Sequence, residues 1–156
     1  MSERQEYFGE AVAERYDADS ASMFDPAVLA PAVDTLAELA GDGRALEFAV
    51  GTGRIALPLA DRGVPVVGID SSEAMLARLR DKPGAERVEA QVGDMAETRV
   101  TGEFALVYLM FNTIFNLTTQ DGQVACFENA ARHLPRGGRF VIEARVPDLQ
   151  RLPLGY

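Results

Sequence analysis

The sequence predicts an α/β fold built on a mainly parallel β-sheet. Short apolar runs alternate along the chain with segments of helical periodicity, the order typical of strands joined by crossover helices. Three of the five apolar runs are almost free of polar residues, as strands covered on both faces require. The first run leads directly into a glycine-rich turn and another helical segment. The 156 residues, 47% of them hydrophobic, suffice for one domain with a full core.

Two helices are expected before the first strand. Residues 5–17 carry aromatic and apolar side chains at helical spacing. A second helix should begin at Asp25-Pro26, because Asp caps a helix and Pro suits its first position, and should end near Ala40. The aromatic and apolar residues of the first helix are Tyr7, Phe8, Val12 and Tyr16.

Five strands and three further helices complete the prediction. We expect helices at about 54–62, 72–81 and 120–134, and only a loop between the third and fourth strands. The strand candidates are Arg44–Val50, Val64–Asp70, Arg87–Val92, Phe104–Met110 and Arg139–Arg145.

The net charge of −9 argues against nucleic acid and anionic membranes as partners. The chain has a single lysine, Lys82, and its arginines are scattered, so no basic run offers a phosphate-binding surface. A small-molecule partner is the better expectation.

Cysteine usage and hydropathy indicate a cytoplasmic protein. Cys126 is the single cysteine, so no disulfide can form within the chain. The first ten residues are polar, and no apolar run reaches the length of a membrane span. We expect no metal site.

The turn after the first strand is the first candidate binding element. Gly51 and Gly53 permit backbone conformations closed to other residues and allow a ligand to approach closely, with Glu47 just ahead of them. Ligands of such sheets bind at the carboxyl ends of the strands. The alternative is a tight turn without a ligand.

Acidic residues end the second and third strands. Asp70 is placed to accept hydrogen bonds from both hydroxyls of a ribose, although it could equally cap the helix that follows. Asp94 could accept a hydrogen bond from an adenine amino group while Met95 packs on the ring. The alternative for Asp94 is an ordinary solvated turn.

The end of the fourth strand, Leu109–Thr113, is unusually apolar. It could form a wall beside a thioether or a sulfonium. For Phe111 and Ile114 taken individually, ordinary core packing is the favoured interpretation.

A dinucleotide site is a rival interpretation of the same turn. Gly51, Gly53 and Ala56 fit the G-x-G-x-x-A fingerprint, with Asp70 as its downstream acid. A pyrophosphate would then lie at the helix N-terminus. The charge of Glu47 is unfavourable near phosphates, and Asp94-Met95 stays unexplained, so this interpretation is the weaker one.

Taken together, these motifs resemble class I S-adenosylmethionine-dependent methyltransferases. The matching segments are LEFAVGTGRIALPLADRG, VVGIDSSEAMLARLR, VGDM, FALVYLMFNTIFNLTTQDGQ and HLPRGGRFVIEA. The resemblance implies a Rossmann-like, doubly wound sheet of strand order 3-2-1-4-5 with helices on both faces, but without the family's sixth and seventh strands. It also implies a helical cap over residues 1–43, a cofactor-binding core over 44–146 and a short tail over 147–156.

The resemblance further assigns roles to individual residues. Glu47 would organise the glycine turn and the methionine ammonium, with Gly51 and Gly53 beside the cofactor. Asp70 would hold the ribose, and the Asp94-Met95 pair would bind adenine. The backbone near Leu109 would receive the ammonium group. The remaining residues of the implied cofactor set are Ala49, Thr52, Ser71, Met75, Gly93 and Phe111.

From the N-terminal helix, Tyr16, with Arg15 as a second candidate, would cover the methionine carboxylate. A structural role for Tyr7, Phe8 and Tyr16 on the core is an equal alternative. Ala49 stands where the family often has a glycine, which narrows the space around the methionine moiety.

Methyl transfer from a sulfonium needs alignment more than acid–base chemistry, and we identify no catalytic base. His133, the single histidine, is expected to be a cation at the end of the last helix, and Cys126 on the same helix is expected to be buried.

The chain ends soon after the fifth strand, where the family's sheet continues, so we expect part of a longer protein or a trimmed chain. Residues 140–144 would then form an exposed apolar edge that self-associates or is covered by the tail. Three hypotheses remain: a methyltransferase acting on a small molecule, a cofactor-binding domain that is catalytically incomplete, and a nicotinamide oxidoreductase.

Overall fold

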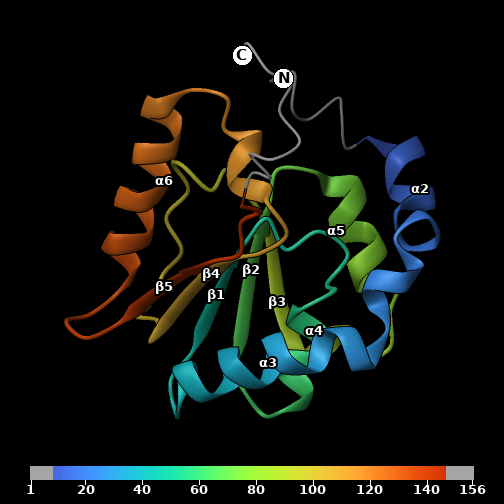
Figure 1. The fold of residues 1–156 in the computed structure, drawn as a ribbon, viewed down its shortest axis with the longest axis horizontal. Helices are drawn as coiled ribbons and strands as arrows, with labels where there is room; N and C mark the ends of the chain where they lie inside the picture. Colours follow the sequence, from blue (N-terminus) through green and yellow to red (C-terminus); the bar gives the residue numbers. More distant parts are fainter. Residues whose placement is uncertain (1–8, 147–156) are drawn as a thin grey trace, which may run out of the picture.

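A computed structural model describes residues 9–146 and shows one five-stranded sheet (Figure 1). Its strand order is β3-β2-β1-β4-β5, and every neighbouring pair is parallel, which confirms the predicted sheet. The predictions for Tyr7, Phe8 and the C-terminal tail fall on residues 1–8 and 147–156, which lie outside the described residues. The strands are β1 (Ala45–Phe48), β2 (Val66–Asp70), β3 (Val88–Val92), β4 (Leu106–Leu109) and β5 (Arg139–Ile142).

Helices cover both faces of the sheet, as predicted. On one face α3, α4 and α5 pack against Ala45, Val66, Leu106 and Tyr108, and on the other α6 packs against Leu46, Phe48 and Val107. Three short 3₁₀ turns, η1 (Ala21–Phe24), η2 (Ala85–Arg87) and η3 (Thr113–Asn116), are additions to the prediction. The α-helices are α2 (Glu10–Asp19), α3 (Pro26–Ala40), α4 (Ala56–Asp61), α5 (Glu73–Arg80) and α6 (Gln120–His133).

Side-chain caps set where the longer helices begin. Asp25 Oδ1 accepts from the Ala27 amide at 2.8 Å and Pro26 occupies the first turn of α3, which confirms the predicted start. Ser72 Oγ caps α5, and Thr119 Oγ1 caps α6. The apolar side of α3 is buried on the sheet through Val33 and Leu36, so α3 belongs to the main core.

The strands are shorter than the apolar runs that predicted them. After Phe48 the chain leaves the β conformation because Ala49 has a φ of 56°. Val50 then folds back over β2, where a Cβ on Gly68 would lie 2.7 Å from it. Gly68 is therefore required for the close approach of the turn to the sheet.

His133 corrects one expectation. Its ring is only 2% exposed and lies edge-on to Phe48 and Phe104. Nε2 accepts from the Val100 amide at 2.9 Å, so Nδ1 carries the proton and donates to the Asn129 carbonyl at 2.7 Å. Burial lowers the pKa of His133. The residue is therefore a neutral link between α6 and the loop before β4, and the expected helix-end cation was wrong.

The expected burial of Cys126 was confirmed. Cys126 is fully buried on α6. Within residues 9–146, no helix has the length and apolarity needed to cross a membrane, and no cluster of three metal-ligating side chains occurs.

Candidate functional site

The carboxyl ends of β1, β2 and β3 meet at one edge of the sheet. The Val50 amide donates to the Ile69 carbonyl at 2.9 Å, and the Gly93 amide donates to the Asp70 carbonyl at 2.9 Å. Asp70 is also in register with Val92, just before Gly93. The structure therefore brings Gly51, Asp70 and Asp94 to a common edge, as the sequence analysis required.

The turn after β1 is shaped by positive φ angles at Ala49 (56°), Gly51 (56°) and Gly53 (84°). A Cβ on Gly53 would press on Leu57 and Leu79 at 3.1 Å, so this glycine allows α4 and α5 to approach. A Cβ on Gly51 would meet only the Met75 Cε, at 3.6 Å. Gly51 therefore faces open space with Met75 at its side, which is the arrangement a ligand needs.

Asp70 joins this turn to β2. Its Oδ2 accepts from the Gly51 amide at 2.8 Å and its Oδ1 from the Ser72 amide at 2.9 Å. The side chain is 8% exposed, and burial raises its pKa against the opposing effect of these two hydrogen bonds. Ser72, rather than Asp70, is the helix cap. Each carboxylate oxygen keeps a lone pair for a further donor.

Glu47 lies in the middle of the sheet, beneath the turn. Its Oε2 accepts from the Tyr108 phenol at 2.9 Å, and both side chains are buried. Burial raises the pKa of Glu47 to about 8, although the bond from Tyr108 and the charge of Arg54 act in the opposite direction. Burial beside Glu47 also raises the pKa of Tyr108 well above its ordinary value. The folded protein therefore keeps the Glu47 carboxyl group protonated up to about pH 8.

Arg54 is a site residue that the sequence analysis missed. Its guanidinium carbon lies 5.0 Å from the centre of the Phe111 ring, and Nη1 donates to the Met23 carbonyl at 3.5 Å. Arg54 therefore connects the glycine turn to η1 and to the end of β4. The position directly after Gly53 was the available signal.

Tyr16 of α2 lies in the same electrostatic environment. Burial raises its pKa; the charge of Arg54 lowers it, and the charges of Asp70 and Glu47 add to the increase. Arg15, the second candidate, is exposed. The structure thus brings Tyr16 close to the turn, while the role expected of it stays a prediction.

The end of β4 is strained. Phe111 and Asn112 have φ angles of 61° and 60°, and with Ala49 they are all the non-glycine residues between 9 and 146 with positive φ. Such strain persists where surrounding contacts enforce it, commonly at functional sites. Here the Phe111 amide donates to Glu143 Oε2 at 2.9 Å, and the Leu109 carbonyl accepts from the Glu143 amide at 3.0 Å.

Phe111 corrects the core-packing interpretation. It is 39% exposed and lies against Arg54, because its left-handed backbone turns the ring away from the core. Ile114 is 7% exposed and packs in the core, as expected.

Asp94 and Met95 follow β3, where Asp94 is half-buried and Met95 is buried. Asp94 Oδ1 accepts from the Ala96 amide at 2.8 Å, and the Asp94 amide donates to Thr98 Oγ1 at 2.7 Å. Met95 is 7% exposed and packs in the core on the α6 side of the sheet. A role of Asp94 and Met95 in binding adenine stays a prediction.

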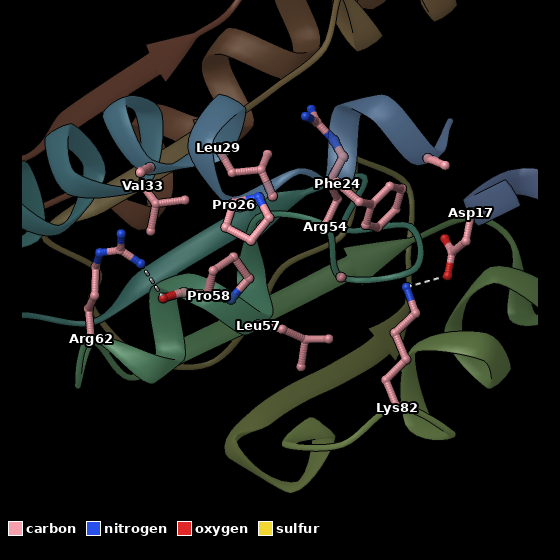
Figure 2. A pocket seen from close by; sticks show the side chains of 13 residues that line it. Asp17, Phe24, Pro26, Leu29, Val33, Arg54, Leu57, Pro58, Arg62 and Lys82 are labelled. Carbon is pink, nitrogen blue, oxygen red and sulfur yellow. Dashed lines mark hydrogen bonds and ion pairs between the residues drawn. The ribbon is translucent and has the colours of Figure 1, made fainter. Parts of the chain in front are cut away.

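A cavity of about 480 Å³ lies behind the glycine turn (Figure 2). Residues of η1, α3 and α4 line it, including Phe24, Leu29 and Pro58, together with Gly53 and Arg54. Asp70 and Asp94 are not among its lining residues. The cavity is therefore distinct from the site at the strand ends.

The side chains at the strand ends favour a ligand that carries an amine, hydroxyl groups and a carboxylate. The carboxyl groups of Glu47 and Asp70 suit an amine and hydroxyl groups, and the guanidinium of Arg54 suits a carboxylate. A pyrophosphate fits poorly, because the Asp70 carboxylate already accepts a hydrogen bond from the Gly51 amide of the turn that would hold it.

Comparisons with known proteins agree with this chemistry. A family model described as "Methyltransferase domain" matches residues 45–138. The cypemycin N-terminal methyltransferase of a Streptomyces species is 32% identical over 141 residues, which cover 90% of this chain and 57% of that protein.

Solved structures give the same result. The CcbJ methyltransferase of Streptomyces caelestis is 40% identical, with a TM-score of 0.68 over 71% of this chain and 46% of that chain. CalS10 of Micromonospora echinaspora, an amino pentose methyltransferase solved with S-adenosylmethionine bound, is 28% identical, with a TM-score of 0.66 over 82% of this chain and 53% of that chain. The chain thus spans about half the length of these relatives.

Proposed function

This chain belongs to the methyltransferase domain family, and we propose that it binds S-adenosylmethionine at the ends of β1, β2 and β3 and transfers the methyl group to a small-molecule acceptor. The observation that carries the proposal is the hydrogen bond from the Gly51 amide to Asp70 Oδ2. It places an open glycine turn beside a carboxylate with lone pairs to spare, as a ligand with a ribose requires.

Five residues would do most of the binding. Asp70 would accept from the ribose hydroxyls, and Glu47 would balance the charge of the methionine ammonium. Arg54 would bind the methionine carboxylate, and Tyr16 would cover that end from α2. Gly51 would let the cofactor lie against the backbone. Asp94 and Met95 remain our candidates for adenine.

The bound cofactor supplies a methyl group on a positively charged sulfur, ready for displacement by a nucleophile. The task of the chain is then to align the acceptor, and positioning of this kind is worth on the order of 7–11 kcal/mol. Arg54 and Phe111 suit this task, because they bring the glycine turn and the strained end of β4 together.

Calorimetry with the purified chain tests the proposal. S-adenosylhomocysteine should bind, whereas NAD and NADP should not. Binding of NAD or NADP in place of S-adenosylhomocysteine would favour an oxidoreductase and overturn the assignment. Turnover with candidate acceptors then separates an active enzyme from a catalytically incomplete domain, a distinction that matters because the chain spans about half the length of its relatives.

Three broader proposals accompany this one. We propose that α2 and η1, within the first 43 residues, act as the cap, while α3 belongs to the core.

We propose a cytoplasmic location, supported by the single buried cysteine. We also propose self-association through β5, which pairs only with β4 among the described strands and is half-exposed over Phe140–Ile142. Sedimentation of the chain tests the last of these.

A further inference from the structure

The single lysine of the chain joins three segments that are far apart in the sequence. Lys82, which follows α5, places its Nζ 2.5 Å from Asp17 Oδ2 on α2 and donates to the Thr52 carbonyl at 2.8 Å. The same ammonium lies 4.8 Å from the centre of the Phe24 ring in η1. Figure 2 shows Lys82 and Asp17 meeting beside the glycine turn.

A further bond closes this group. The Thr52 hydroxyl donates to Asp17 Oδ1 at 2.6 Å, so both oxygens of Asp17 are engaged. Thr52 is 1% exposed, and the side chain of Lys82 is 23% exposed. We call Lys82, Asp17 and Thr52 the Lys82 latch. Hydrogen bonds between charged groups that are partly shielded from water are among the stronger contacts in proteins.

The two ends of the latch both border the proposed donor site. Asp17 adjoins Tyr16, and Thr52 stands between Gly51 and Gly53. A contact that joins Asp17 to Thr52 therefore limits how far Tyr16 can move from the glycine turn. A compact ammonium suits this position, because it can serve a carboxylate, a carbonyl and an aromatic face at once.

We propose that Lys82 is a positioning residue for the donor site, which holds α2 against the glycine turn so that Tyr16 stays over the methionine end of the bound cofactor. This inference rests on the proposed function. Departure of the product then requires α2 to move away, so the latch should mainly slow dissociation. By linkage, a bound ligand should in turn favour the closed latch.

The chain offers a matched control. Arg78 on α5 and Glu14 on α2 form an ion pair at 3.7 Å, with side chains 44% and 57% exposed. Within residues 9–146, neither side chain makes a hydrogen bond or ion pair to the glycine turn. We expect Lys82→Met to raise the Kd of S-adenosylhomocysteine about tenfold, the loss expected for one hydrogen bond to a charged group. Arg78→Met should change the Kd less than about twofold, as exposed pairs usually do.

Surface-plasmon resonance with immobilised protein gives the deciding rates. In Lys82→Met the dissociation rate should rise, while the association rate stays the same or increases. Lys82→Met and Arg78→Met should both unfold as cooperatively on heating as the wild type. A wild-type Kd and dissociation rate in folded Lys82→Met would overturn the latch alone. Failure of the wild-type chain to bind S-adenosylhomocysteine would overturn the proposed function, and the latch with it.

A second measurement covers the case in which Lys82→Met does not fold. Because the chain has one lysine, an amine-reactive reagent followed by mass spectrometry reports on Lys82 separately from the N-terminal amine. S-adenosylhomocysteine should slow modification of Lys82 at least severalfold in the wild type. Modification at the same rate with and without saturating ligand would overturn the proposal.

Discussion

The phenol of Tyr108 donates a hydrogen bond of 2.9 Å to Glu47 Oε2 where neither side chain meets solvent. The two residues are register partners on β4 and β1, so the bond runs across the centre of the sheet. A carboxyl group so enclosed is costly to ionise, which is why burial is the main cause of its raised pKa of about 8.

Glu47 should make the empty protein less stable as the pH rises. The folded state keeps the proton up to about pH 8, whereas the unfolded state releases it near pH 4.5, so the free energy of unfolding should fall between these values. Glu47→Gln should remove this part of the pH dependence, as urea unfolding at pH 5.5 to 8.5 would show. Tyr108→Phe should extend the decline to higher pH, because it removes a bond that favours the ionised form. Equal slopes in wild type and Glu47→Gln would contradict this account.

Asp70→Ala should weaken binding of S-adenosylhomocysteine by at least about tenfold. The substitution removes the carboxylate that would accept hydrogen bonds from the ligand and that accepts one from the Gly51 amide. Asp25→Ala is the matched control. It removes a carboxylate that caps α3 through the Ala27 amide, at a cost of about 1 kcal/mol. Calorimetry should show an unchanged Kd for Asp25→Ala. Wild-type affinity in a folded Asp70→Ala protein would refute the role of this carboxylate.

Arg54→Met should lower affinity for S-adenosylhomocysteine about tenfold and leave affinity for adenosine unchanged, because adenosine lacks the carboxylate that Arg54 would bind. Arg62→Met serves as the control. Arg62 lines the same cavity (Figure 2), and its charge is paired with Asp34 at 2.6 Å. If Arg54→Met weakened both ligands equally, the side chain would be supporting the fold of the turn rather than binding a carboxylate.

His133 should make the protein sensitive to acid. Its pKa is lowered in the folded state, so the stabilising contribution is complete above the unfolded value of about 6.5 and is lost as the pH falls below it. Protonation would also end the bond from the Val100 amide. His133→Gln should cost about 1–3 kcal/mol near pH 7.5 but flatten the decline toward pH 5, measured by urea unfolding. A decline as steep in the variant as in the wild type would exclude His133 as its source.

Much of the fold could be predicted because it depends on residues close together in the chain. The Asp25-Pro26 start of α3 is one case, because a cap involves residues two or three positions apart. The glycine turn after β1 is another, since its shape depends on local φ angles. The alternation of apolar runs with helical segments then predicted parallel strands with turns at their carboxyl ends.

The partners of the buried polar groups could not be predicted in the same way. Tyr108 and Glu47 are 61 positions apart, and Lys82 and Thr52 are 30 apart. His133 was expected to be a cation because it lies at the C-terminal end of the last helix, whereas the Val100 amide, across the fold, requires a neutral acceptor. Phe111 was expected in the core, and only the strained end of β4 turns it toward Arg54.

The sequence by itself therefore determined the sheet, its helices and the edge at which Gly51, Asp70 and Asp94 gather, because hydrophobic periodicity and local backbone preference act over a few residues. The tertiary structure alone decided which charges are buried, which are paired and which stay open to a ligand. Those properties depend on solvent exclusion and on contacts between distant segments, and neither can be read from spacing along the chain.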